Sequence, residues 1–365
     1  MNRQSVRTMV TAAAALTLAL GLTACGAANE GSASKAPAGS KLSGTLNAGG
    51  SSAQESAVAA WKKAFQSTNP GVTVNYDPVG SGGGREQFLA GGLDLAGSDA
   101  YLTDDELTKA KDRCKSDVVE VPVYVSPIAV IYNLDGVDDL NLAPKTVAAI
   151  FEGKITTWND AAIKADNPDA KLPATKISPV HRSDDSGTTE NFTDYLDQTG
   201  EGAWTGGKTK TWPVKSGEAA EGTSGVVAAV TNGKGTIGYA DAGQAGDLGK
   251  ANIKVGEDFT KPSADAAAKV LDASTAVEGR AATDIAIDVD RKLTDKGVYP
   301  IVLVSYQIAC QSYDKKETAD LVKGWLSYVS SSEGQKAAAT DAGSAPLSDA
   351  VAEKVKTAVE TIAAA

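Results

Sequence analysis

Three segments of the chain share one order: a short apolar strand, a turn rich in Gly and Ser or Thr, and a helix. The turns are residues 49–52, 80–84 and 186–189. Strands that alternate with helices predict an α/β fold with a mostly parallel sheet. Each turn places backbone N–H groups and hydroxyls at the positive end of a helix, where an anion can bind. Any one of them is explained more simply as a helix N-cap, but three such turns together favour an anion site.

The length of 365 residues exceeds what one compact core usually holds, so two lobes are expected. Two long apolar segments, 118–133 and 298–309, can each cross between lobes, and 118–133 can also form two successive strands. We expect lobe I to comprise 41–123 and 302–365, and lobe II to comprise 124–301. Two crossings form a hinge that permits closure around a ligand.

The N-terminus has the layout of an export signal. Arg3 and Arg7 precede an apolar stretch too short to span a membrane, and Leu22-Thr-Ala-Cys25 resembles a bacterial lipobox. We expect residues 1–24 to be a lipoprotein signal peptide and Cys25 to carry palmitate or a similar lipid. The alternative is a plain signal peptide with an incidental Cys. The small polar residues 25–40 read as a flexible tether, so the protein is expected at the outer face of the cell membrane.

Composition excludes several classes of function. A net charge of −11 disfavours nucleic acid and anionic membrane surfaces as partners, which leaves the lipid as the membrane contact. His181 is the single His, so a His-rich metal site is impossible, and we expect no metal. In an exported protein, Cys114 and Cys310 are expected to form a disulfide. The segment 202–209 fits the letters of a phosphate-binding P-loop, but Pro213 disfavours the helix that such a loop requires, so we assign it to a surface loop.

Two side chains near the turns point to the kind of anion. The Arg182 guanidinium can grip a tetrahedral oxyanion, and Asp184 can hold its fork in place; the alternative is an ordinary surface ion pair. Asp99 would repel an anion unless that anion carries a proton to donate, as hydrogen phosphate does and sulfate does not. The alternative for Asp99 is a helix cap before residues 101–107. A structural role is expected for His181, at the end of a strand.

The stretch His181-Arg-Ser-Asp-Asp-Ser-Gly-Thr188, with its R-x-D-x-S-G-T core, resembles the phosphate-binding lipoproteins that feed the bacterial ABC-type phosphate importer. Segments 79–84, 97–100, 151–158 and 235–239 agree in the same order. The resemblance covers nearly all of residues 44–362, and its Ser-rich first turn is similar to members from high-GC Gram-positive bacteria. It implies a two-lobed class II periplasmic-binding-protein-like fold with a two-strand hinge, and no cofactor.

The same resemblance implies a non-enzymatic receptor that captures inorganic phosphate and delivers it to the membrane subunits of an ABC permease. The ligand contacts that it implies are Ser81, Asp99, Arg182, Ser186, Gly187 and Thr188. In the first turn Ser51 and Ser52 stand where the family often has Thr and Phe, and they are expected to keep a hydroxyl and a backbone N–H contact. The alternatives are a binding protein for another oxyanion, such as sulfate or molybdate, or a secreted phosphatase-like hydrolase.

Overall fold

The computed structural model describes residues 42–215 and 217–365. These described residues form one compact unit. The expected signal peptide, Cys25 and the tether lie outside the described residues. Within the described residues, no helix combines the length and the apolar character needed to cross a bilayer.

The main sheet has nine strands in the described part of the chain. Its order is β2-β1-β3-β14-β4-β8-β6-β7, and β9 pairs with β4. The strands are β1 (Ser43–Gly50), β2 (Gly71–Asp77), β3 (Leu95–Ser98), β4 (Val118–Asn133), β6 (Ser178–Arg182), β7 (Glu218–Ala220), β8 (Thr236–Asp241), β9 (Gly249–Lys250) and β14 (Val302–Cys310).

The expectation of a mostly parallel sheet is wrong at its centre. The pairs β1–β2, β1–β3, β6–β7 and β6–β8 are parallel. However, β14 runs antiparallel to both β3 and β4, and β4 runs antiparallel to β8. The reason is the connectivity, because β4 carries the chain out of the first group of strands and β14 brings it back in the opposite direction.

Strand β4 is the central crossing element. It is one continuous strand, which decides between the two alternatives for 118–133. Its residues 118–127 pair with β14, and its residues 128–133 pair with β8. The β4–β14 register shifts between Ser305 and Tyr306, because Ser305 pairs with Tyr124 while Tyr306 pairs with Pro122. The pairing skips Val123, and Pro122 beside it has no backbone N–H to donate to the ladder.

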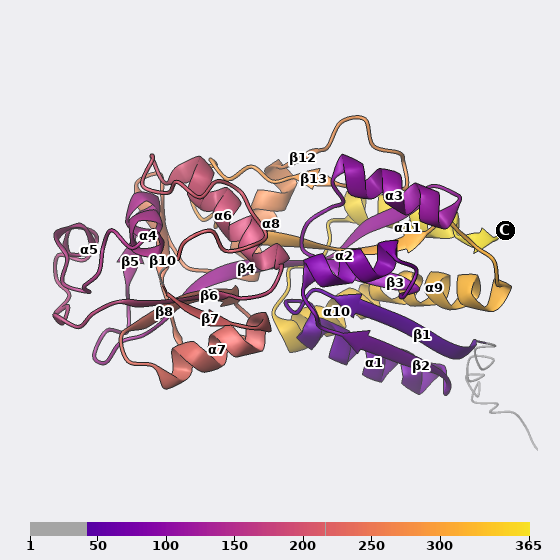
Figure 1. Cartoon of the computed structure of the whole chain (residues 1–365), viewed down its shortest axis with the longest axis horizontal. Coiled ribbons are helices and arrows are strands. Elements are labelled where there is room, and N and C mark those ends of the chain that lie inside the picture. The colour runs from indigo at the N-terminus through magenta and orange to yellow at the C-terminus, as the bar shows by residue number, and fades with distance from the viewer. Residues whose placement is uncertain (1–41, 216) are drawn as a thin grey trace, which may run out of the picture. The chain divides into compact units, whose positions relative to one another are not determined.

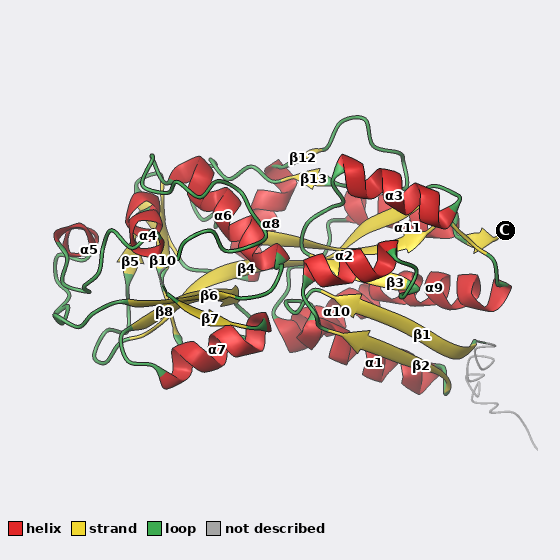
Figure 2. Cartoon of the chain, viewed as in Figure 1, coloured by secondary structure: helices red, strands yellow, loops and turns green. Residues whose placement is uncertain are grey.

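The helices gather in two groups around the ends of β4 (Figure 1). We use lobe I for β1–β3 with α1 (Glu55–Thr68), α2 (Ser81–Leu89), α3 (Asp104–Cys114), α9 (Lys316–Val329), α10 (Ser332–Ala342) and α11 (Asp349–Glu360). We use lobe II for β6–β9 with α4 (Pro144–Phe151), α5 (Ala161–Asp166), α6 (Gly187–Thr199), α7 (Gly222–Asn232) and α8 (Ala264–Ala273). Figure 2 shows the strands running between these helices.

Smaller strand pairs complete the fold. A three-stranded sheet in lobe II contains β5 (Asn141–Leu142), β10 (Asn252–Val255) and β11 (Asp258–Thr260). The other pairs are β12 (Thr275–Ala276) with β13 (Ile287–Asp288), and β15 (Ser312–Tyr313) with β16 (Ala363–Ala364).

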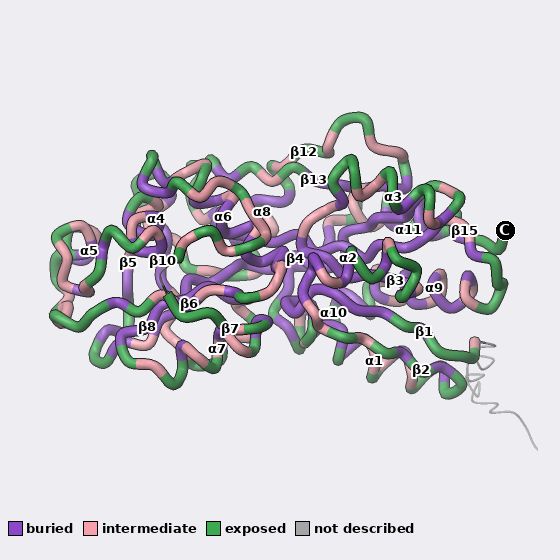
Figure 3. The backbone as a smooth tube through the Cα atoms, viewed as in Figure 1, coloured by how far each residue is buried: buried purple, intermediate pink, exposed green. Residues whose placement is uncertain are grey.

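The core follows the crossing strands. Every residue of β14 and all of β4 except its last residue are buried (Figure 3). In lobe I, Trp61 and Trp325 meet edge to face at 6.5 Å. In lobe II, Phe192 stacks on Tyr239 at 4.4 Å. Burial on both faces explains why β4 and β14 read as continuous apolar runs rather than as alternating strands.

A disulfide joins Cys114, at the end of α3, to Cys310, at the end of β14, with a Cα–Cα distance of 5.4 Å. The bridge is the one that the cysteine count predicts, and it spans 196 residues of sequence. It connects two elements of the lobe I side, so it ties that lobe together across the long excursion through lobe II.

Candidate functional site

The turns singled out in the sequence come together around one carboxylate. Ser51 follows β1, Ser81 begins α2, and Asp99 follows β3; all three are buried. Oγ of Ser51 donates to Oδ1 of Asp99 at 2.5 Å, and the backbone N–H of Asp99 donates to Oγ of Ser81 at 3.0 Å. From lobe II, Oγ1 of Thr188 donates to Oδ2 of Asp99 at 3.2 Å. Hydroxyls from both lobes therefore meet at Asp99.

Two glycines make this close approach possible. Gly50 has φ of 135°, and a Cβ there would lie 2.0 Å from the carbonyl oxygen of Gly97. A Cβ on Gly187, the first residue of α6, would lie 2.5 Å from Oγ of Ser81 and 2.8 Å from Cβ of Asp99. The absence of a side chain at Gly187 therefore lets the N-terminus of α6 reach the Asp99 carboxylate.

Arg182 is the buried cation of the site, and Asp184 orients it. Nε of Arg182 donates to Oδ1 of Asp184 at 2.7 Å, and Nη2 donates to Oδ2. The backbone N–H of Gly222 adds a bond to Oδ1 at 3.0 Å. Burial opposes ionisation of Asp184, but the hydrogen bonds and charge of Arg182 outweigh it and lower the pKa of the carboxyl. The guanidinium is thus held in a fixed orientation beside the turn that leads to Ser186.

Ser52 lies in the same region but has different partners. Its Oγ accepts from the backbone N–H of Thr223 in α7 at 3.0 Å and lies 3.0 Å from Oγ1 of that residue. Nε2 of Gln244 donates to the carbonyl oxygen of Ser52 at 2.9 Å. The side chain of Ser52 therefore joins the first turn of lobe I to lobe II.

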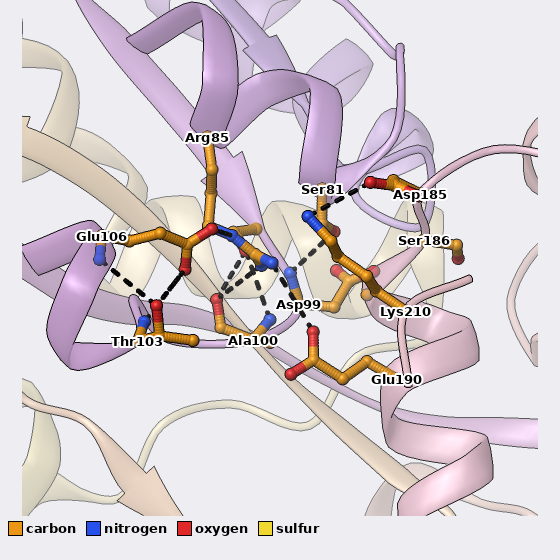
Figure 4. A network of polar contacts seen from close by, with 12 residues as sticks. Ser81, Arg85, Asp99, Ala100, Thr103, Glu106, Asp185, Ser186, Glu190 and Lys210 are labelled. Atoms are coloured by element: carbon orange, nitrogen blue, oxygen red, sulfur yellow. Dashed lines mark hydrogen bonds and ion pairs between the residues drawn. The ribbon is translucent and has the colours of Figure 1, made fainter. Parts of the chain in front are cut away.

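Charged contacts surround the site where the lobes meet (Figure 4). Arg85 of α2 donates to Oε1 of Glu106 at 3.1 Å and to Oγ of Ser98 at 2.8 Å. Its Nη2 lies 3.6 Å from Oε2 of Glu190, in the first turn of α6. In addition, the carbonyl oxygen of Asp185 accepts from the backbone N–H of Gly82 at 2.9 Å. The two lobes are thus in direct contact beside the site.

The structure separates the binding and capping explanations of two residues. The N-cap of α3 is Thr103, which forms a capping box with Glu106, so Asp99 is not the cap of that helix. Ser186 is the N-cap of α6, because its Oγ accepts from the backbone N–H of Thr189 at 3.1 Å. Its hydroxyl oxygen therefore accepts a helix-capping hydrogen bond, as the capping explanation of this turn requires.

Two further sequence interpretations can be compared with the structure. His181 stacks on Trp212 at 5.1 Å, and its Nδ1 lies 3.0 Å from the carbonyl oxygen of Arg182, which is a packing role. Residues 202–209 contain neither helix nor strand and form a loop. Within the described residues, no group of three or more His, Cys, Asp or Glu is placed to hold a metal ion.

Sequence reasoning missed two residues that bind Asp99. Oγ of Ser305, in β14, donates to Oδ1 of Asp99. Nδ2 of Asn191 donates to the backbone carbonyl of Asp99 at 2.6 Å. Ser305 belongs to no Gly/Ser turn, and the only signal available was a small polar residue inside the apolar run of residues 302–310.

Comparisons with known proteins agree with this fold and arrangement. A family model described as a PBP superfamily domain matches residues 35–333, which sets the class of the protein. Phosphate-binding protein PstS 3 of Mycobacterium tuberculosis (strain ATCC 25618 / H37Rv) is 37% identical over 374 residues, covering 100% of both chains. Phosphate-binding protein PstS 3 of Mycobacterium leprae (strain TN) is 38% identical over 357 residues, covering 94% of this chain and 95% of the relative. The chain therefore belongs to the PstS-type phosphate-binding proteins of the PBP superfamily.

Solved structures show the same fold. A high-affinity periplasmic phosphate-binding protein (PfluDING), solved with bound phosphate at pH 8.5, superposes with a TM-score of 0.71. It is 22% identical in sequence, and the superposition covers 86% of this chain and 93% of that one. A phosphate-binding protein from Stenotrophomonas maltophilia superposes with a TM-score of 0.69 at 21% identity, covering 86% and 94% of the two chains.

Proposed function

We propose that this protein captures inorganic phosphate between its two lobes and delivers it to an ABC-type phosphate permease. The observation that carries the proposal is the buried Asp99 carboxylate, which receives hydroxyl donors from both lobes beside the N-terminus of α6. The names of the relatives support it. The proposed phosphate contacts are those that the family resemblance implies: Ser51, Ser52, Ser81, Asp99, Arg182, Ser186, Gly187 and Thr188, with Asp184 orienting Arg182.

Asp99 accounts for the choice among oxyanions. A carboxylate in a site without water can face only a ligand atom that donates a hydrogen bond, because an unpaired buried charge costs several kcal/mol. Near neutral pH, phosphate carries at least one proton, whereas sulfate carries none. The site therefore favours phosphate over sulfate or molybdate, while Arg182 would attract any of these anions.

Calorimetry on two variants tests this assignment. Asp99→Asn replaces an acceptor by a donor, so we expect lower affinity for phosphate and measurable binding of sulfate. Arg182→Ala should weaken binding of both anions, because the charge of Arg182 serves either one. If Asp99→Asn leaves the phosphate-to-sulfate ratio unchanged, Asp99 does not select the ligand. If the wild-type protein binds no phosphate, the proposed function is wrong.

We infer that the protein is a receptor and not an enzyme. Its relatives are named as binding proteins, and His181 is engaged in packing against Trp212. The remaining alternative, a phosphatase-like hydrolase, predicts turnover of phosphate monoesters. An ester-hydrolysis assay with the purified protein is expected to show none, and turnover abolished by Arg182→Ala would contradict this inference.

We also propose that residues 1–24 are removed on export and that a lipid on Cys25 anchors the protein outside the cell membrane, with residues 25–40 as a tether. The division proposed for the exported part is lobe I at 41–123 and 302–365, and lobe II at 124–301. Membrane fractionation tests the anchor. Cys25→Ala should move the protein from the membrane to the medium or leave its precursor unprocessed. A variant that is processed normally and stays on the membrane contradicts the lipid anchor.

A further inference from the structure

We propose that Ser305 is a positioning residue that keeps the Asp99 carboxylate a hydrogen-bond acceptor while the ligand is bound, and so contributes to selectivity for a protonated anion. The inference rests on the proposed function, because it concerns the same site. It assigns a role to a strand residue outside the three Gly/Ser turns.

The register of the sheet brings Ser305 to Asp99. Strand β14 is antiparallel to β3, and Tyr306 pairs with Ser98, so the neighbouring residues Ser305 and Asp99 lie beside one another. The side chain of Ser305 is fully buried, and its hydroxyl donates to Oδ1 of Asp99. This contact comes from the crossing strand, whereas Ser51 donates from the turn after β1 and Thr188 from the start of α6.

Hydrogen bonds, and not an ion pair, stabilise the charge of Asp99. Among the described residues, no Lys or Arg lies within ion-pair distance of its carboxylate. Oδ1 receives Ser51 and Ser305, and Oδ2 receives Thr188. A carboxylate accepts such bonds through the lone pairs of both of its oxygens. Three hydroxyl groups thus donate to the two carboxylate oxygens of Asp99, so the carboxylate is hydrogen-bonded in this structure by the protein's own side chains.

A bound anion must compete for these donors. Each hydroxyl has one proton, which it gives either to Asp99 or to the ligand. Ser51 and Thr188 are among the contacts that the proposed function assigns to phosphate, so their hydroxyls are expected to turn to the anion. Ser305 extends from a strand buried on both faces and stays with Asp99. Once phosphate is bound, Ser305 is the hydroxyl that still holds the carboxylate as an acceptor for the proton of the ligand.

The test compares phosphate and sulfate binding by calorimetry in Ser305→Ala. Without this donor, the carboxylate is no longer held facing the ligand, so it accepts the proton of phosphate less well and repels sulfate less directly. We expect phosphate affinity to fall by about tenfold, sulfate affinity to stay the same or rise, and their ratio to fall by at least about tenfold, since the lost bond is donated to a charged group. Ser305→Thr keeps the hydroxyl and should restore most of the ratio.

Ser344→Ala is the matched control, because Ser344 is a buried Ser whose hydroxyl has no partner in the structure. It should leave the phosphate-to-sulfate ratio unchanged. If Ser305→Ala lowers both affinities equally, or leaves the ratio at the wild-type value, the proposal is overturned. Should Ser305→Thr fail to fold, the ratio in Ser305→Ala decides alone. If the wild-type protein binds phosphate and Asp99→Asn changes the phosphate-to-sulfate ratio but Ser305→Ala does not, this inference is rejected and the proposed function stands.

Discussion

At the scale of the residue, the closeness of the two lobes depends on one missing side chain. Gly187 begins α6 with Ser81 and Asp99 directly against its Cα. Its role is steric, and it differs from that of the Gly residues that only make turns. In the proposed function, the backbone N–H group of Gly187 also binds the anion, so one residue would serve both close packing and binding.

Gly187→Ala is expected to lower phosphate affinity by at least about tenfold, because the added Cβ would force α6 away from lobe I and weaken more than one hydrogen bond of about 1 kcal/mol. Gly225→Ala in α7 is the control, since a Cβ there would meet its nearest atom at 3.6 Å. That control should bind phosphate as the wild type does and gain up to about 1 kcal/mol of stability. Equal phosphate affinity in Gly187→Ala and wild type would show that α6 does not need this closeness.

Asp241 gives the protein a pH-dependent stability. It is fully buried at the end of β8, where it accepts from Tyr124 Oη at 2.9 Å and from the backbone N–H of Gly243 at 3.0 Å. Burial, with the nearby charge of Asp99, raises its pKa to about 7, although hydrogen bonds from Ser126 and Tyr124 oppose the shift. The folded state therefore holds a proton that the unfolded chain releases near its ordinary pKa.

Protonated Asp241 therefore adds to the free energy of unfolding, and this contribution is fully present below about pH 4 and is lost as the pH rises towards 7. Asp241→Asn imitates the protonated form and should remove this dependence, at roughly 1.4 kcal/mol for each unit of the pKa shift. Denaturant unfolding at pH 5 and pH 8 measures it. We expect the variant to gain stability relative to the wild type as the pH rises; an equal difference at both values contradicts the raised pKa.

At the scale of the element, strands were easier to predict than their directions. The apolar runs of 118–133 and 298–309 correspond to β4 and to β14 with a preceding loop. Their antiparallel pairing could not be predicted, because burial on both faces removes the alternating pattern that would show a register. Helix α10 went unnoticed, since its sequence is rich in Ala and has no clear apolar stripe. Ser305 was missed because a single Ser in a strand resembles any small buried residue.

Helices α2 and α6 carry an ion pair that joins the lobes, between Arg85 and Glu190. Because this pair requires both lobes, Glu190→Gln should mainly speed the release of phosphate. Dissociation is expected to rise by about two- to tenfold, since the pair is largely buried and a partner charge is left behind, while association stays close to wild type. Stopped-flow fluorescence measures both rates. Asp117→Asn, which breaks the exposed pair with Lys111 within lobe I, is the control. A slower association with unchanged dissociation would contradict a closing role.

At the scale of the whole molecule, lobe I is assembled from distant parts of the chain, and one covalent bond secures that assembly. The Cys114–Cys310 disulfide closes a loop with a sequence separation of 196 residues, which contains all of lobe II. Residues of the 275–301 region also return to lobe I, where the backbone of Asp284 forms an isolated β-bridge with that of Glu120 in β4. Stability and ligand binding are thus supported by different contacts.

Replacing both cysteines by Ser should reduce the free energy of unfolding by about 5 kcal/mol, on the loop-entropy account for a loop of this size. Phosphate affinity should stay close to wild type, because Cys310 lies five residues, or about 17 Å of strand, beyond Ser305. Chemical denaturation and calorimetry on the double variant measure the two quantities. Two reactive thiols in the unfolded, unreduced wild-type protein would contradict the bridge.

The register shift between β4 and β14 has a mechanical consequence. The paired strands β4 and β14 join the two lobes, and their pairing is interrupted at the register shift beside Pro122. Bending of the pair is therefore expected first at that point. If the lobes rotate as rigid bodies about that point, each atom moves in proportion to its distance from it. Ser305 lies at the register shift itself, whereas Thr188 lies in α6, which would rotate with lobe II. Separation of the lobes would therefore break the hydrogen bond between Thr188 and Asp99, while the hydrogen bond between Ser305 and Asp99 would change least.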